Sequence, residues 1–306
     1  MALLFAFQLP AFAEAEAPAD LDTRYEHYYV FYTLNDDRSH VETHDWARKI
    51  LKERAVANAK KAHVTYSTSI QKAEVLSAYT RKADGRRIKV PKDNYQVEVN
   101  RGKDKDAPVF SDRTTLTVVF PEVAVGDTVV FSYKIVQREA MFPGHFSISS
   151  YFPREYAYDD VRIRIDAPAS VWAQYAARDM VEKVSEQRGR KVLEWTYQHK
   201  EPLRNKRQNY SVYDVDGVPG LAYSTFRSYE DIAQAYGTRA TPKAAVTDRI
   251  RKLADEIVKD KTKPRDQAHA LYDWVAKNIS YAGHCIGVGA VVPHDVPFVL
   301  DNRMGD

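Results

Sequence analysis

The sequence lacks both disulfide chemistry and a strong charge of either sign. Cys285 is the only cysteine among 306 residues, so no disulfide can form within the chain. Even if the protein is exported, its stability must then come from a packed core. The net charge of +3, from 45 basic and 42 acidic residues, gives no reason to expect a nucleic-acid partner. The basic clusters at 81–82, 86–87 and 204–207 lie among turn residues and are interpreted as solvated loops.

Long apolar runs are also scarce. Residues 3–13 form one short run that ends in Ala11-Phe12-Ala13, an A-x-A cleavage pattern followed by acidic sequence. This predicts a signal peptide over residues 1–13, although the usual basic segment is missing and an apolar disordered N-terminus is the alternative. The run is too short to span a bilayer, and no other segment is apolar enough. We therefore expect an exported protein of the bacterial periplasm, with no integral membrane segment after signal cleavage.

Aromatic residues are abundant, and their pattern predicts a β-rich N-terminal domain. The chain contains 20 Tyr and 12 Phe, and its length allows about two domains. Alternating or β-branched runs bounded by turn signals predict a sandwich-like domain over residues 22–200. Residues 45–61 are ambiguous between strand and helix, and residues 92–108 are polar and loop-like. The predicted strands are 28–33, 41–44, 63–67, 88–90, 116–120, 129–135, 161–165 and 192–197.

The periodicity changes in the C-terminal third. Residues 201–240 are taken as a linker because 201–220 is rich in Pro, Gly, Asn and charge. Thr241-Pro242 is typical of a helix N-terminus, and apolar residues then recur at helical spacing over 242–260 and 265–279. An antiparallel helix pair should open a second domain at residues 241–306. The expected fold class is α+β, with an all-β domain followed by helices.

The β-rich part resembles the domain-of-unknown-function family 3857, which precedes transglutaminase-like cores in many bacterial proteins. The resemblance covers roughly residues 22–200. It rests on the segments 83–90, 110–116, 120–127 and 131–133, including the Val125-Gly126-Asp127 turn.

The C-terminal part resembles the start of a transglutaminase-like core, which has a papain-like α+β fold. The matching elements are the segment Trp274 to Tyr281, the loop residues Gly287, Gly289 and Pro293, and the final residues 303–306. In that family the nucleophilic cysteine directly follows Gly-Asp. The resemblance therefore implies that the chain ends one residue before its nucleophile, with the partner histidine and acidic residue further downstream.

The chemistry of a cysteine nucleophile explains such a turn. Gly305 would let the backbone turn tightly, and Asp306 would cap the following helix, whose N-terminus lowers the pKa of a thiol. The resemblance implies cysteine-dependent acyl transfer or amide hydrolysis on a peptide or protein of the cell envelope, without a cofactor. We expect no catalytic residue within the chain itself. The alternative is a non-catalytic binding module on a degenerate scaffold.

Several other residues invite a functional interpretation. Trp274 and Tyr281 are candidates for the substrate cleft, with a core position as the alternative for Trp274. Cys285 lies beside His284 and near His294 and Asp295, but its surroundings predict a loop or strand that would not activate a thiol. The spacing of these four residues fits no standard zinc pattern, so no metal ligand is expected. The tyrosines of 28–32 could stack on sugar or peptide, or could simply form the sandwich core and rim.

Overall fold

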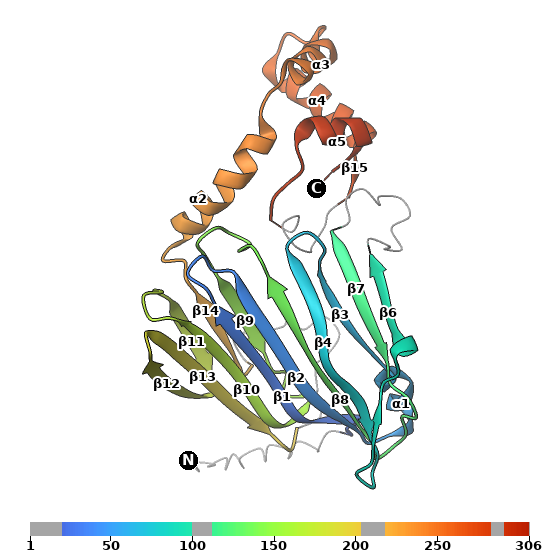
Figure 1. The fold of residues 1–306 in the computed structure, drawn as a ribbon. Helices are drawn as coiled ribbons and strands as arrows, with labels where there is room; N and C mark the ends of the chain where they lie inside the picture. Colours follow the sequence, from blue (N-terminus) through green and yellow to red (C-terminus); the bar gives the residue numbers. More distant parts are fainter. Residues whose placement is uncertain (1–19, 100–111, 203–217, 283–290, 306) are drawn as a thin grey trace, which may run out of the picture.

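Strands form most of the chain up to Ser224, and helices form most of the remainder (Figure 1). The computed structural model describes residues 20–99, 112–202, 218–282 and 291–305. The strands of the β-rich part are β1 (Thr23–Leu34), β2 (His40–Ile50), β3 (Lys61–Ser67), β4 (Gln71–Arg81), β5 (Arg87–Lys89), β6 (Tyr95–Val99), β7 (Arg113–Val119), β8 (Thr128–Gln137), β9 (Ser147–Tyr151), β10 (Ala157–Pro168), β11 (Gln174–Arg178), β12 (Val181–Gln187), β13 (Arg190–His199) and β14 (Gly220–Ser224). Helix α1 (Glu53–Ala59) and the 3-10 turn η1 (Lys92–Asn94) lie between them.

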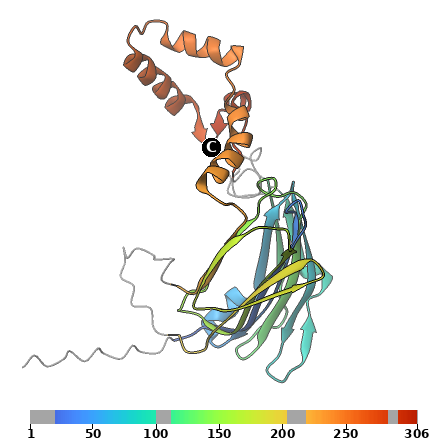
Figure 2. The same ribbon diagram turned by 90° about the vertical axis from the view of Figure 1, so that its left-hand side faces the viewer.

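The β-rich part is sandwich-like, with one large sheet and two smaller sheets. The eight strands of the large sheet run in the order β12-β13-β10-β1-β2-β8-β4-β5, and only the β1–β10 pair is parallel. The smaller sheets have the orders β11-β14-β9 and β3-β7-β6. Both pack against the same face of the large sheet, as the two views show (Figures 1 and 2).

The alternation of side chains along β1 and β2 explains how one sheet contributes to two hydrophobic cores. Val30 and Tyr32 of β1 belong to the core beneath β11-β14-β9, which surrounds the fully buried Trp195. Trp46 of β2, paired with Tyr28, packs on the core beneath β3-β7-β6, which surrounds Phe131. Side chains of directly paired residues point to the same face of a sheet. The seam between the two cores therefore runs between β1 and β2.

The predicted strands are all present, but three sequence interpretations need correction. The ambiguous stretch 45–61 divides into the end of β2, helix α1 and the start of β3. The stretch 92–108 was expected to be loop, yet it contains η1 and β6. Strand β6 pairs with β7 although four of its five residues are exposed. The stretch 201–240 was expected to be linker, yet β14 pairs with both β11 and β9 inside it.

The C-terminal part contains helices and one small sheet. Its elements are α2 (Tyr229–Ala240), the 3-10 turn η4 (Thr241–Ala244), α3 (Asp248–Val258), α4 (Pro264–Asn278), β15 (Ser280–Tyr281), α5 (Val296–Asn302) and β16 (Met304–Gly305). Helix α2 also falls within the expected linker; the Ser228 side chain caps it by accepting a hydrogen bond from the amide of Asp231. These elements stand beyond one end of the sheets (Figures 1 and 2).

The helix predicted over 242–260 begins later than its sequence indicated. Thr241-Pro242 starts only a 3-10 turn, and Thr247 is the true N-cap of α3, its side chain accepting from the amide of Ile250. Thr241 and Thr247, six residues apart, gave two possible starts, and only Thr247 has the capping hydrogen bond. Helix α4 begins at Pro264 and ends at Asn278, close to the prediction, and it packs against α3. In the described part of the chain, none of the helices is long and apolar enough to span a membrane.

Candidate functional site

The residues that the sequence singled out near the C-terminus meet at a two-stranded parallel sheet. Strand β15 pairs with β16 so that Tyr281 lies opposite Gly305. The amide of Ser280 donates to the carbonyl oxygen of Arg303 at 2.8 Å, and that of Ala282 donates to Gly305 at 2.7 Å. This pairing joins the end of α4 to the end of the chain segment that follows α5. Tyr281 is 84% exposed, so its ring is free to contact a ligand.

Trp274 belongs to the same cluster. Its half-buried ring lies on α4, and the guanidinium of Arg303 sits 5.1 Å from the ring centroid in a cation–π contact. Arg303 adopts a left-handed backbone conformation (φ 56°) directly after α5, which turns the chain into β16. Trp274 thus packs against the turn that leads into β16, and its position in a substrate cleft stays a prediction.

Gly305 is required by a close approach to α5. A Cβ atom at this position would lie 2.8 Å from Cγ1 of Val299 and 3.0 Å from its Cγ2. Real Cβ atoms do not approach heavy atoms so closely, and the β-branched Val299 has little rotamer freedom to yield. Glycine here therefore permits packing of the strand on the helix. Its role in the turn before a nucleophilic cysteine stays a prediction.

Only some of the remaining candidate residues lie in the described part of the chain. Asp306, His284 and Cys285 lie outside the described residues. Asp295 forms an ion pair with Lys243 at 3.1 Å, and the ring of His294 stacks on Phe298 at 5.1 Å, so both have structural contacts of their own. The described residues contain no group of three or more His, Cys, Asp or Glu arranged to hold a metal ion.

The tyrosine-rich strand β1 divides between the two faces of the large sheet. Tyr28 and Tyr32 point toward the core side, while Tyr29 lies on the opposite face between His27 and Phe31 in a stacked column. The Tyr29 hydroxyl donates to Asp160 at 2.6 Å, and partial burial together with this carboxylate raises the pKa of Tyr29 to about 12. Rings stacked on one another present their edges outward, which makes a poor flat platform for sugar.

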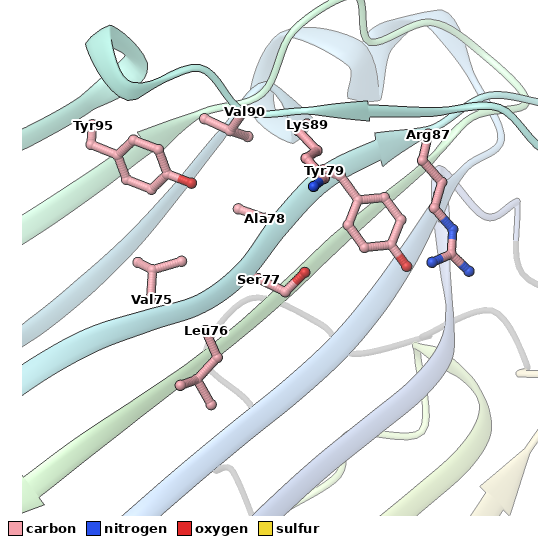
Figure 3. Close-up of a pocket in the computed structure, with 9 residues that line it drawn as sticks. All are labelled: Val75, Leu76, Ser77, Ala78, Tyr79, Arg87, Lys89, Val90 and Tyr95. Carbon is pink, nitrogen blue, oxygen red and sulfur yellow. The ribbon is translucent and has the colours of Figure 1, made fainter.

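A cavity of about 410 Å³ opens where β5 leaves β4, at the edge of the large sheet. Figure 3 shows it between the β4 residues 75–79 and the segment from Arg87 to Tyr95. Arg87 lies over the ring of Tyr79 at 5.1 Å. The described lining residues include neither a histidine nor a carboxylate, and the titratable groups among them are those of Tyr79, Arg87, Lys89 and Tyr95.

A second cavity, of about 290 Å³, lies at the end of the seam between the two cores, and we call it the seam cavity. Two turns form its mouth: the β1–β2 turn, which carries Arg38, and the turn from Phe142 to His145. Further lining comes from Tyr32, His40, Glu42, Gln137, Ala140, Met141, Phe146, Ser147, Ile148 and Phe226.

The turn from Phe142 to His145 has the chemistry of a type II turn. The amide of His145 donates to the carbonyl of Phe142 at 2.9 Å, Pro143 occupies the second position and Gly144 has φ +76° at the third. The turn places the ring of His145 flat on Phe226 at 4.0 Å and Phe142 edge-on to the same ring at 5.7 Å. Phe226 follows β14 and lies just before the N-cap of α2.

The inner wall of the seam cavity carries a buried polar network. Glu42 accepts hydrogen bonds from Tyr32 at 3.3 Å and pairs with Nε2 of His44. Burial acts to raise the pKa of Glu42, but the hydrogen bond and charge of His44, with His40 nearby, outweigh it and lower the pKa overall. Burial lowers the pKa of His40, so that imidazole is neutral near neutral pH.

Sequence reasoning missed the seam cavity, although two signals for it are present. Phe142-Pro143-Gly144-His145 is a recognisable type II turn. His40, Glu42 and His44 alternate along one strand, which places three polar side chains on the face that Trp46 marks as the core side. A strand with that pattern needs a polar or ligand-bearing environment within the core.

A family model matches more than half of the chain. It is DUF3857, described as a domain of unknown function with a solved structure, and it covers residues 36–204. The crystal structure of a candidate protease from Parabacteroides distasonis aligns over 93% of this chain with a TM-score of 0.82 and 17% identity, which shows a shared fold. The chain spans 56% of that protein's length. An M1 zinc metallopeptidase from Deinococcus radiodurans aligns over 67% of this chain and 43% of its own, at 14% identity and a TM-score of only 0.31. No curated protein matches the sequence.

Proposed function

The chain belongs to the DUF3857 family, and we propose that it is part of an exported cysteine-dependent acyltransferase or amide hydrolase with a transglutaminase-like core. Residues 264–305 would form one wall of the active site, and the nucleophilic cysteine would directly follow Asp306. The substrate would be a peptide or protein of the bacterial cell envelope. The catalytic histidine and acidic residue would come from sequence beyond this chain.

The pairing of Tyr281 with Gly305 is the observation that carries this proposal. It brings the end of the helix that resembles the family motif next to Gly305, although 23 residues lie between Tyr281 and Gly305 in sequence. A cysteine after Asp306 would be two positions from the residue that Tyr281 pairs with. The shared fold with the Parabacteroides distasonis protein, itself described only as a candidate protease, supports the same class of reaction.

The coding sequence directly after Asp306 provides the first test. A cysteine codon next, with histidine and acidic codons further on, agrees with the proposal. Serine or alanine at that position would contradict the enzyme assignment and favour the non-catalytic binding module.

A further inference from the structure

We propose that the seam cavity binds a carboxylate attached to an apolar group the size of one amino-acid residue. The site lies in the β-rich part, and the inference stands or falls independently of the cysteine chemistry proposed above. Three features support it: unsatisfied buried donors in the wall, a carboxylate of the protein that is already paired, and an aromatic lining of suitable volume.

The donors come from the two turns at the mouth of the cavity. Nε of Arg38 and Nδ1 of His145 are both buried and have no hydrogen-bond partner among the described residues. Nε of Arg38 is always a donor, and Nδ1 of His145 is a donor in one neutral tautomer and in the imidazolium. Arg38 is held in a left-handed conformation (φ 71°), and its amide donates to Asn35 at 3.0 Å, so the turn fixes where its side chain leaves the backbone. A buried donor without a partner is unfavourable, and native proteins rarely tolerate one unless a ligand, water or ion completes it.

One nitrogen of the Arg38 guanidinium donates to the carbonyl oxygen of Asp36 at the surface, and the charge of Arg38 also acts toward the core. Burial raises the pKa of Tyr223 to about 12, and the nearby positive charge of Arg38 acts in the opposite direction. Tyr223 belongs to the buried core of the β11-β14-β9 sheet, so the guanidinium is close enough to act on a core phenol. Because an arginine keeps its charge at any ordinary pH, an anion is the partner that compensates it best.

Two carboxylates lie near Arg38, and both already have other partners. The exposed Asp37, whose pKa the charge of Arg38 helps to lower, accepts hydrogen bonds from the amide and hydroxyl of Ser39. Among the described residues that line the cavity, Glu42 is the one carboxylate. Glu42 is engaged by Tyr32 and by His44 on the inner wall. Nδ1 of His40 donates to the carbonyl oxygen of Arg38 at 3.3 Å, and its ring packs on Phe146 at 4.8 Å. The wall therefore has a cation at its mouth and an already paired anion at its base, an arrangement that favours an incoming carboxylate at the mouth.

Most of the remaining lining is apolar and suits a small hydrophobic body, with Gln137 and Ser147 as the polar exceptions. Phenylalanine, isoleucine and methionine side chains surround the space below the two donors. A volume of about 290 Å³ lies at the lower end of typical ligand pockets, about 300–1,000 Å³, which fits one aromatic or branched residue rather than a long peptide. The C-terminal residue of a peptide and a free aryl acid share this chemistry.

Titration calorimetry with N-acetyl-L-phenylalanine and 3-phenylpropanoate tests the proposal. We expect at least one acid to bind at millimolar concentration or below, and N-acetyl-L-phenylalaninamide to bind at least about tenfold more weakly because it lacks the charge. Binding of the N-acetyl amino acid alone would identify a peptide end as the source. Binding of both acids would identify any apolar carboxylate.

Two substitutions and one control localise the effect. R38Q and H145Q should each weaken acid binding, R38Q by at least about tenfold, while R86Q, an exposed arginine on the β4–β5 hairpin, should leave it unchanged. Circular dichroism spectra establish whether each variant is folded. If R38Q does not fold, H145Q alone tests the site. Equal binding of acid and amide, unchanged binding by the folded variants, or no binding of either acid would overturn the proposal.

Discussion

Asp127 is expected to be one of the most sensitive positions of the β-rich part. Its side chain, in a residue only 2% exposed, accepts hydrogen bonds from the amide of Ala124 at 2.8 Å and the amide of Ala83 at 3.2 Å. It also pairs with Nζ of Lys82 at 2.6 Å. One carboxylate thereby joins the β7–β8 turn to the β4–β5 hairpin, which gives Asp127 a structural role.

The size of the effect follows from what the substitution D127A leaves behind. Two backbone amides lose their acceptor, and the Lys82 ammonium, 18% exposed, loses its counter-ion. Breaking a buried ion pair costs about 3–5 kcal/mol, and the partial exposure of Lys82 reduces this to about 2–4 kcal/mol. Typical domains have about 5–15 kcal/mol of stability, so D127A should be folded but clearly weakened.

Urea unfolding followed by tryptophan fluorescence measures this effect, because Trp46 and Trp195 report on the two cores. The matched control is E74Q, which removes an ion pair with Lys134 in which Glu74 is 58% exposed. E74Q should change the free energy of unfolding by less than about 0.5 kcal/mol. A loss below about 1 kcal/mol for D127A, with an unchanged denaturant slope, would refute the reasoning.

Three further predictions concern single positions. G305A should lower stability by about 1–3 kcal/mol in thermal unfolding because its Cβ would overlap Val299. Combining G305A with V299A should recover part of that loss, whereas losses that simply add would contradict the overlap. Burial lowers the pKa of His40, so the contribution of its neutral ring to stability is fully present above the unfolded pKa of about 6.5 and is lost as the pH falls. The midpoint of urea unfolding should therefore fall between about pH 8 and pH 5, and H40L should make that fall smaller. G144A should destabilise the type II turn by about 1–2 kcal/mol, measured by thermal unfolding, since alanine disfavours φ +76°; an unchanged melting temperature would contradict this.

Much of the β-rich part could be predicted because its central strands alternate regularly. Strand β10 places Val161, Ile163 and Ile165 in the core and charged residues on the other face, a pattern readable from the sequence. Strand β12 was missed because every one of its residues is exposed, and it exists only through its hairpin with β13. Strand β14 was missed because its five residues pair with strands far away in sequence.

The two candidate sites differ in how far the sequence could reveal them. The cluster around Tyr281 and Gly305 was named from a family resemblance, and the structure adds their pairing and the Arg303 contact with Trp274. The seam cavity depends on Arg38 and His145 meeting across about a hundred residues of chain. Local periodicity carries no information about such a contact, and only the order of the strands brings the two turns together.

The most direct test of the proposed function is thiol reactivity in a protein that includes the residues following Asp306. Iodoacetamide labelling, mapped by mass spectrometry as a function of pH, compares the cysteine proposed to follow Asp306 with Cys285. We predict that the thiol after Asp306 is labelled faster and remains reactive below the ordinary cysteine pKa of about 8.5, as expected for a thiolate stabilised at a helix N-terminus. Equal rates at the two positions, or labelling of Cys285 alone, would contradict the proposed active site.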